Sequence, residues 1–457
     1  MLNKKENVVI LGGGLVGSLM AVLLAKRGYP VTVYEGRPDP REKGYERGRS
    51  INLALSHRGW KALESAGIAD VVKGIAIPMY GRMMHSPTGE LTYQPYDSTG
   101  KAIYSVTRGL LNLAICNEAI RHGATFHFGY RSVEVNLKNN QLTLRHIHGN
   151  ELLTVQPDIL IGADGAFSAV RQAMQRTDRF NYSQSYIEYG YKELSIPPTP
   201  EGGFYLEKNA LHIWPRGNFM LIALPNNDGS FTCTLFFPFE GAVSFEQLTS
   251  DDKIYTFFKQ HFPDAVSLMP DLLQEFAENP TSSLITIRCN PWTYQGRVGL
   301  IGDAAHAIVP FYGQGMNAGF EDCRILAELL DLHQGNWAMA FKAYEKLRIV
   351  NANAIADLAL MNFVEMRDFV ANPKFLLRKK IEAHLHQLFP NEWIPLYTMV
   401  TFSDMPYSEA LHIGKMQDEI MQRVMCGANI EENWESLDFE AIKNELVQKI
   451  RCSVSAT

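Results

Sequence analysis

The stretch NVVILGGGLVGSLMAVLLAKRGYPVTVYE, residues 7–35, predicts a βαβ unit at the start of the chain. Residues 7–11 form a continuous apolar run, which is typical of a buried parallel strand. Residues 18–28 carry helical periodicity, and residues 30–35 read as a second strand. Between the first strand and the helix lie three glycines in the spacing G-x-G-x-x-G, so this turn decides the fold.

Each of these glycines has a separate physical task. Gly12 allows the tight turn, Gly14 lets backbone approach a pyrophosphate, and Gly17 lets helix and strand pack closely. The helix then offers free N–H groups and the positive end of its dipole to phosphate. Glu35 ends the second strand, where an acid can bind ribose hydroxyls. The motif in this context predicts a dinucleotide site, with a purely structural turn as the alternative.

Two further glycine turns carry a carboxylate directly after an apolar strand. GADGAFSAVR, residues 162–171, contains Asp164, and IGDAAH, residues 301–306, contains Asp303. A glycine-rich approach to a new helix near Gly315 follows the second turn. We therefore expect a flat, polar-edged and partly anionic ligand at this place, against the alternative of an ordinary turn.

Composition excludes several classes of function. The chain has 457 residues, of which 46% are hydrophobic and 20% charged, and this is ordinary for a soluble globular protein. Its net charge of -6 gives no basic excess for nucleic acid. The six cysteines lack metal-ligand or CxxC spacing, so we expect reduced thiols and no metal site. No apolar stretch is long enough to predict a transmembrane segment.

The fold class we predict is α/β plus β. A Rossmann-like domain is interleaved with an antiparallel-sheet domain, in which residues 219–226 and 230–240 should be neighbouring strands, and a helical part follows. Residues 124–147 read as a meander that turns at two asparagines. The expected boundaries are 1–70, 101–180 and 286–335 for the nucleotide domain, 71–100 and 181–285 for the sheet domain, and 336–457 for the helices.

The three glycine sites, taken in order, resemble those of the FAD-dependent aromatic hydroxylases with a single dinucleotide fold. The resemblance implies that Asp303 holds the ribityl chain of FAD, that Asp164 lies near FAD and the path of NADPH, and that Arg108 faces the pyrophosphate. It also implies that NADPH reduces FAD and that a flavin C4a-hydroperoxide oxygenates the substrate, so no catalytic side chain is expected. His306 is expected to order its loop. The implied cofactor-binding residues are Gly12, Gly14, Val16, Gly17, Glu35, Arg37, Leu55, Arg108, Asp164, Asp303, Gly315, Met316 and Asn317.

Five longer stretches are more specific. They are RGRSINLALSHRGWKALE (47–64), GRMMHSPTGELTYQPY (81–96), VPFYGQGMNAGFEDC (309–323), NFVEMRD (362–368) and YTMVTFSDMPYSEA (397–410). Together they resemble the branch of that family that hydroxylates L-kynurenine to 3-hydroxy-L-kynurenine with molecular oxygen. The resemblance implies that Arg82 and Tyr96 hold the substrate carboxylate, and that Asn362 and Tyr397 bind its amino-acid group.

The resemblance also implies an apolar wall against the aromatic ring and a loop over its edge. Taken without it, Arg82 would read as a surface strand residue, Asn362 as part of a solvated helix face, and the wall as plain sheet core. The role of Tyr312 stays open. The wall residues are Leu211, Ile213, Leu224, Thr234 and Phe236, and the loop residues are Pro310 and Phe311.

Two other functions stay open from the sequence. One is a related hydroxylase of another aryl acid, such as anthranilate or a hydroxybenzoate, and the other is a non-catalytic protein like the GDP-dissociation inhibitors. Eukaryotic relatives carry a C-terminal apolar anchor that this chain lacks, so we expect a soluble, cytoplasmic, bacterial protein. Residues 372–390 are amphipathic and should pack as a helix over the active site. Oligomeric state and the choice between NADPH and NADH are left open.

Overall fold

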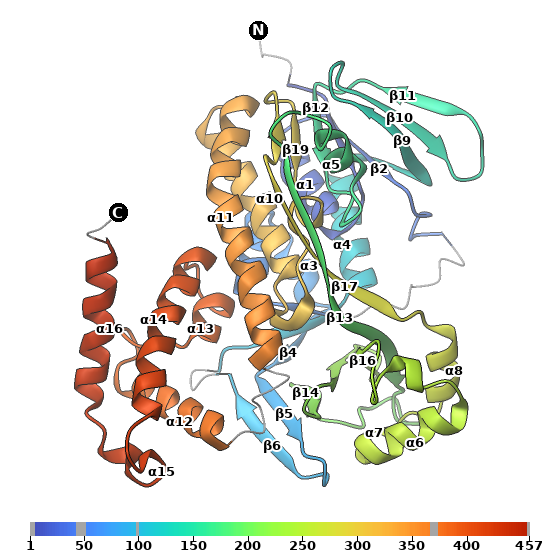
Figure 1. Cartoon of the computed structure of the whole chain (residues 1–457). Helices are drawn as coiled ribbons and strands as arrows, with labels where there is room; N and C mark the ends of the chain where they lie inside the picture. The colour runs from blue at the N-terminus through green and yellow to red at the C-terminus, as the bar shows by residue number, and fades with distance from the viewer. Residues whose placement is uncertain (1–4, 43–51, 97–99, 366–372, 455–457) are drawn as a thin grey trace.

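The computed structural model describes residues 5–42, 52–96, 100–365 and 373–454 (Figure 1). The first five residues of the stretch 47–64 and the last three of 362–368 therefore lie outside the described residues. The expected βαβ unit is present as strand β1 (Val8–Leu11), helix α1 (Leu15–Lys26) and strand β2 (Val31–Glu35).

These strands belong to a six-stranded sheet in the order β18-β19-β12-β1-β2-β8. β1 pairs in parallel with β2 and with β12, and β12 pairs in parallel with β19. The carboxyl ends of β1, β12 and β19 therefore meet at one edge, which brings the three glycine turns together. The remaining strands are β8 (Thr125–Phe128), β12 (Ile159–Gly162), β18 (Thr293–Tyr294) and β19 (Val298–Leu300).

The meander expected over residues 124–147 is only partly correct. β8 leaves it to extend the six-stranded sheet, where it pairs in parallel with β2. The following two strands do form a hairpin that turns at Asn139-Asn140, and a third strand completes a separate small sheet. These strands are β9 (Tyr130–Asn136), β10 (Gln141–His146) and β11 (Leu152–Val155).

A seven-stranded sheet in the order β17-β13-β16-β15-β14-β5-β6 forms the second half of the molecule. The strands predicted at 219–226 and 230–240 are neighbours and antiparallel, as expected. One pair departs from the predicted antiparallel arrangement. β5 and β14 run parallel, which is possible because a long stretch of chain separates them. The strands are β5 (Gly81–His85), β6 (Leu91–Pro95), β13 (Asn181–Ile196), β14 (Ala210–Pro215), β15 (Met220–Pro225), β16 (Phe231–Pro238) and β17 (Ser282–Asn290).

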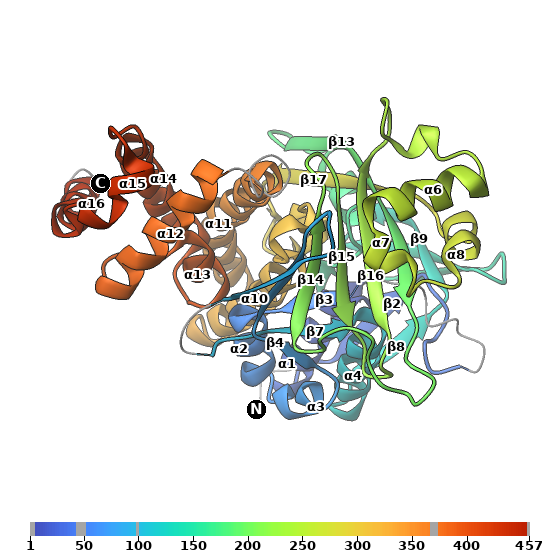
Figure 2. The same ribbon diagram turned by 90° about the horizontal axis from the view of Figure 1, so that it is seen from below.

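One face of this sheet is covered by three helices, and the other face is left for a cavity. Leu221 and Ala223 pack with Phe257 and Phe258 in one hydrophobic cluster, whereas Met220, Ile222 and Leu224 point to the opposite face. Figure 2 shows the three helices lying together against this sheet. They are α6 (Asp251–His261), α7 (Pro263–Val266) and α8 (Leu272–Glu278).

Smaller elements connect the two sheets. A three-stranded sheet has the order β3-β7-β4, and several helices pack around it and the six-stranded sheet. The strands are β3 (Asn52–Leu55), β4 (Ile77–Met79) and β7 (Ile103–Thr107). The helices are α2 (His57–Ser65), α3 (Ala69–Lys73), α4 (Arg108–Arg121), α5 (Ala169–Met174), α9 (Asp303–His306) and α10 (Gly315–Leu332).

The C-terminal part is helical, as predicted. The amphipathic helix α12 packs through Ile381 and Leu385 against residues of α14 and α16, and none of its residues lines the cavity described below. Within the described ranges, α11 is the one helix with the length and apolar character to cross a membrane, and half of its apolar window is buried inside the protein. The helices are α11 (Trp337–Val364), α12 (Pro373–Leu388), α13 (Leu396–Thr401), α14 (Tyr407–Met425), α15 (Ile430–Asn433) and α16 (Phe439–Val454).

Candidate active site

A large cavity lies where the carboxyl edge of the six-stranded sheet meets the open face of the seven-stranded sheet. Its enclosed volume is about 300 Å³. Sites for drug-sized ligands span roughly 300–1,000 Å³, so the cavity has the size of a ligand site. Fifteen predicted residues line it: Gly14, Val16, Arg82, Arg108, Leu211, Ile213, Leu224, Thr234, Phe236, Asp303, Pro310, Phe311, Gly315, Met316 and Tyr397.

The first glycine turn has the geometry that its sequence predicts. A Cβ on Gly12, which has a φ of 104°, would lie 2.4 Å from the carbonyl oxygen of Ala163. A Cβ on Gly17 would lie 1.9 Å from the carbonyl oxygen of Gly12. These two glycines therefore serve close packing behind the cavity. Gly14 instead exposes its backbone to the cavity, at the start of α1.

Glu35 holds the first glycine turn by hydrogen bonds. Its Oε2 accepts a hydrogen bond of 2.7 Å from the amide of Gly13, and its Oε1 accepts one of 2.8 Å from Nε of Arg37. Burial alone would raise the pKa of Glu35, but the hydrogen bonds and charge of Arg37 lower it overall. The carboxylate is therefore ionised and fixed to the turn, and neither Glu35 nor Arg37 lines the cavity.

The third glycine turn brings a carboxylate into the cavity. Asp303 is exposed there at the start of α9 and makes no hydrogen bond to any other residue that the structure describes. Gly315 and Met316 open α10 beside it, and the N-cap of α10 makes no side-chain hydrogen bond to the helix. An acceptor and the positive end of an 18-residue helix thus face the same space.

Asn317 and Leu55 belong to the support of this loop. The amide of Asn317 donates to the carbonyls of Ala54 and Gly313, and its Oδ1 accepts from the amide of Ser56. Leu55 is fully buried beneath it. Neither residue lines the cavity, so both act on a ligand only through the backbone they hold.

Asp164 is not brought to the cavity. Its Oδ2 accepts a hydrogen bond of 2.6 Å from the amide of Ala169, at the start of α5. Burial raises the pKa of Asp164, although the hydrogen bonds at α5 oppose this. Its neighbours Ala163 and Gly165 do line the cavity, so here it is the backbone of the second glycine turn that faces a ligand.

The cofactor end of the cavity fits FAD on these observations. The backbone cradle at Gly14 and the uncapped start of α10 suit a pyrophosphate and a flavin edge that becomes anionic on reduction. Arg108 adds a positive charge, and Asp303 adds an unpartnered acceptor for hydroxyl groups. The site thus presents donors for phosphate and an acceptor for the polyol chain.

At the opposite end, three tyrosines stack around one guanidinium. The ring centroids of Tyr96 and Tyr397 lie 5.5 Å apart, and those of Tyr397 and Tyr312 lie 5.6 Å apart. The guanidinium of Arg82 lies 4.6 Å from the centroid of Tyr397 and 5.5 Å from that of Tyr96. Tyr312, whose role was left open, therefore lines the cavity as the third ring of this stack.

Among the described residues, two polar atoms of this end are buried without a hydrogen-bond partner: Nε of Arg82, which lines the cavity, and the hydroxyl of Tyr96, which does not. Burial raises the pKa of Tyr96 well above its ordinary value, so this hydroxyl is a neutral donor. An arginine fork beside a neutral O–H donor is suited to a carboxylate, which can accept from both.

The predicted apolar wall is present, and the prediction missed part of it. Leu211 and Ile213 come from β14, Leu224 from β15, and Thr234 and Phe236 from β16. Met220 and Ile222 also line the cavity, from the same face of β15 as Leu224. The two-residue period of β15 would have revealed both.

Asn362 contacts the loop at Phe311, and His306 lies in the third glycine turn. Nδ2 of Asn362 donates a hydrogen bond of 2.7 Å to the carbonyl of Phe311, and Asn362 does not line the cavity. His306 is buried, stacks on Trp292 and lies 2.5 Å from Oδ2 of Asp322. These contacts agree with the expectation that His306 orders its loop.

Comparison with known proteins identifies relatives over nearly the whole chain. A family model described as an FAD binding domain matches residues 5–359. The chain is 50% identical to kynurenine 3-monooxygenase of Flavobacterium psychrophilum, across 98% of this chain and 99% of that protein. It is 46% identical to kynurenine 3-monooxygenase of Dictyostelium discoideum, across 98% of both chains. A solved structure of 2-methyl-3-hydroxypyridine-5-carboxylic acid oxygenase shares the fold, with a TM-score of 0.66 and 21% identity over 81% of this chain and 95% of that one.

Proposed function

Because the chain belongs to the kynurenine 3-monooxygenase family of FAD-binding proteins, we propose that it hydroxylates L-kynurenine at ring carbon 3. It is an FAD-dependent monooxygenase, with NADPH as reductant and molecular oxygen as co-substrate. The observation that carries the substrate assignment is the pair of buried donors on Arg82 and Tyr96, which have no hydrogen-bond partner within the described ranges and suit the carboxylate of an amino acid.

We assign the substrate's two ends to two parts of the cavity. Arg82 binds the carboxylate through its guanidinium fork, and Tyr96 donates its hydroxyl to the same group. Tyr397 holds the guanidinium from one side. The aromatic ring lies against Ile222, Leu224 and the other side chains of the apolar wall, which orient it and keep water out.

The residues around FAD hold and orient it, and bound FAD supplies the oxygen-transfer chemistry. The backbone at Gly14 and the guanidinium of Arg108 bind its pyrophosphate. Asp303 accepts from the hydroxyls of its ribityl chain, and the start of α10 at Gly315 stabilises negative charge on the flavin. Asn362 keeps Phe311 over the ring edge by holding its carbonyl.

We also propose the domain limits and the cellular location. The nucleotide domain comprises residues 1–70, 101–180 and 286–335, and β17 extends the seven-stranded sheet as far as Asn290. Cys116, Cys233, Cys289 and Cys323 are buried free thiols, which supports a reducing cytoplasm.

A product assay tests the proposed function. FAD-loaded protein given NADPH, oxygen and L-kynurenine should form 3-hydroxy-L-kynurenine, and L-kynurenine should accelerate NADPH oxidation with little release of hydrogen peroxide. Anthranilate and a hydroxybenzoate serve as control substrates. Turnover of either control without turnover of L-kynurenine would reassign the substrate. A colourless protein that cannot take up FAD would refute the assignment as an FAD-dependent enzyme.

A further inference from the structure

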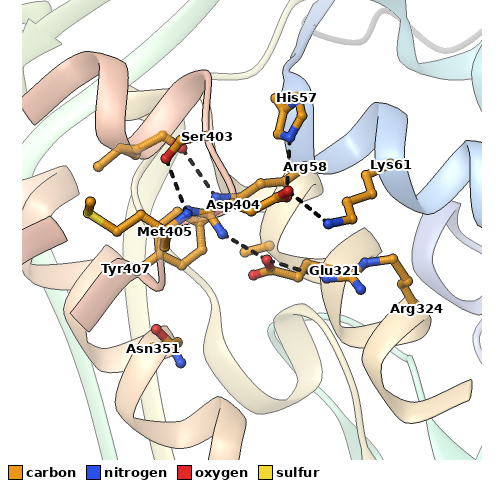
Figure 3. Close-up of polar contacts among 12 residues, drawn as sticks. His57, Arg58, Lys61, Glu321, Arg324, Asn351, Ser403, Asp404, Met405 and Tyr407 are labelled. Carbon is orange, nitrogen blue, oxygen red and sulfur yellow. Dashed lines mark hydrogen bonds and ion pairs between the residues drawn. The ribbon is translucent and has the colours of Figure 1, made fainter. Parts of the chain in front are cut away.

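Arg58 lies outside the cavity and connects its two ends. It comes from the first turn of α2 and is 2% exposed. Its NH1 donates 2.8 Å to Oε1 of Glu321 on α10, and its Nε donates 3.2 Å to the carbonyl of Val400 on α13. Its NH2 donates to the carbonyl of Met405 (Figure 3). One side chain thus ties the flavin-edge helix to the segment that carries Tyr397.

The charge of Arg58 is balanced inside the protein. Glu321 also accepts a 2.5 Å hydrogen bond from NH1 of Arg348, whose Nε donates 2.7 Å to Asp322. The side chains of Arg58, Glu321, Arg348 and Asp322 are at most 7% exposed, so two positive and two negative charges are buried together. Arg324 lies 3.9 Å from Glu321, and His306 lies 2.5 Å from Asp322, at the edges of this network. This network holds Arg58 in one orientation, with two of its donors directed at backbone carbonyls.

Those carbonyls belong to the segment that follows Tyr397, beside the proposed carboxylate site. Val400 lies one helical turn after Tyr397 in the short helix α13, so a bond to its carbonyl restrains the backbone that carries the Tyr397 ring. Phe402, between the two carbonyls, has its ring centroid 5.8 Å from that of Tyr96. The guanidinium of Arg58 also lies 4.0 Å from the ring of Tyr407, which begins α14.

We propose that Arg58 is a positioning residue for substrate binding. It holds the segment from 396 to 407 so that Tyr397 sits against Arg82 and completes the carboxylate site. This inference rests on the proposed function, because it concerns the same pocket. Arg58 touches neither the apolar wall nor the cavity, and it acts only through Tyr397 and its neighbours.

A second contact between the same two segments supplies a matched control. Lys61, one turn later on α2, donates 2.8 Å to Asp404, and His57 lies 3.1 Å from the same carboxylate. The side chains of Lys61 and Asp404 are 40% and 55% exposed. Exposed ion pairs contribute little to stability. The donors of Arg58 instead make hydrogen bonds from a buried guanidinium to backbone carbonyls, where a lost partner is costly. The proposal therefore assigns the positioning to Arg58 and not to Lys61.

The test compares Arg58→Lys with Lys61→Met in FAD-loaded protein. Lysine keeps the charge beside Glu321 and so keeps the network balanced, but it cannot make the planar fork to two carbonyls. Binding of L-kynurenine, followed by flavin fluorescence, should weaken about tenfold or more in Arg58→Lys and less than twofold in Lys61→Met. FAD affinity should stay within about twofold of the parent in both. Arg58→Gln replaces the lysine variant if that one does not load FAD.

A second measurement separates positioning from general destabilisation. In a Tyr397→Ala background, Arg58→Lys should change L-kynurenine binding by less than about twofold, because the ring that Arg58 positions is gone. Hydrogen exchange of the amides in α13 should be faster in Arg58→Lys than in the parent. An unchanged affinity in Arg58→Lys, or an equal loss with and without Tyr397, would overturn the positioning role. A parent protein that does not bind L-kynurenine would instead overturn the proposed function.

Discussion

The two ends of the cavity are built in different ways. The cofactor end consists mainly of backbone: three turns at one edge of a parallel sheet, where Gly12 and Gly17 leave no room for a side chain. The substrate end consists of side chains from distant segments, with Arg82 on β5 and Tyr397 on α13. The comparison teaches that a local motif can specify the first end, whereas the second depends on how the domains dock.

The largest effect should come from the substrate end. Arg82→Met should weaken L-kynurenine binding by about two to three decades, because the substrate carboxylate then lacks its counter-charge in a buried site, at a cost of about 3–5 kcal/mol. FAD should stay bound, so the purified protein should remain yellow. Fluorescence titration measures the binding. Equal affinity in the variant and the parent would contradict the substrate assignment and leave the flavoprotein assignment intact.

The next prediction concerns the cofactor end of the cavity. Asp303→Ala should weaken FAD binding by roughly one to two decades, because a hydrogen bond to a charged acceptor contributes about 1.5–3 kcal/mol. Titration of apoprotein with FAD measures the loss, and Asp303→Asn is the control that keeps an acceptor. If Asp303→Ala takes up FAD as tightly as the parent does, the ribityl role is wrong.

A change behind the substrate sheet should alter stability and leave both ends intact. Burial lowers the pKa of His212 from 6.5 to about 4, so the unfolded chain binds a proton that the folded one does not between these pH values. Folding stability should therefore fall as the pH falls from about 6.5 to about 4, by up to about 1.4 kcal/mol per pH unit. Urea unfolding should show a shallower loss in His212→Gln. Parallel losses in the two proteins would argue against this role of His212.

The smallest effect is expected for Tyr96→Phe, which measures what one hydroxyl contributes to the carboxylate site. Tyr96→Phe keeps the ring that stacks on Tyr397 and removes one hydroxyl, so L-kynurenine binding should weaken by about 0.5–1.5 kcal/mol, roughly tenfold or less. The same change removes a buried hydroxyl without a partner, so the ligand-free protein should be no less stable. Paired binding and unfolding titrations check both expectations. A loss as large as that of Arg82→Met would mean that Tyr96, not Arg82, dominates the site.

The strand, turn and helix around the first glycine motif can be predicted from the sequence because their signals are local. Three glycines, a strand and a terminal acid lie within residues 7–35, and they specify their own geometry. Asp164 shows the limit of this reasoning, because the same turn lets its carboxylate rotate onto the amides of α5. Which way that side chain turns depends on a helix that the motif does not specify.

At the substrate end the missing information is of two kinds. Met220 and Ile222 were missed although the alternation along β15 contains them. Arg58 is different, because its bond to Glu321 joins residues 263 positions apart and its bonds to Val400 and Met405 end on backbone carbonyls. Backbone acceptors leave no trace in side-chain patterns. Only the folded chain shows that this arginine connects α10 to the segment that carries Tyr397.

The position of α13 near the end of the chain has a consequence for biosynthesis. A ribosome releases β1, β12, β19 and α10 before it makes Tyr397, so the backbone turns can assemble while the carboxylate site still lacks one wall. On the proposed assignment, the nascent protein completes its nucleotide-binding turns before it completes the carboxylate site. A chain whose synthesis stops short of α13 has the three glycine turns but lacks the Tyr397 ring that lies against Arg82.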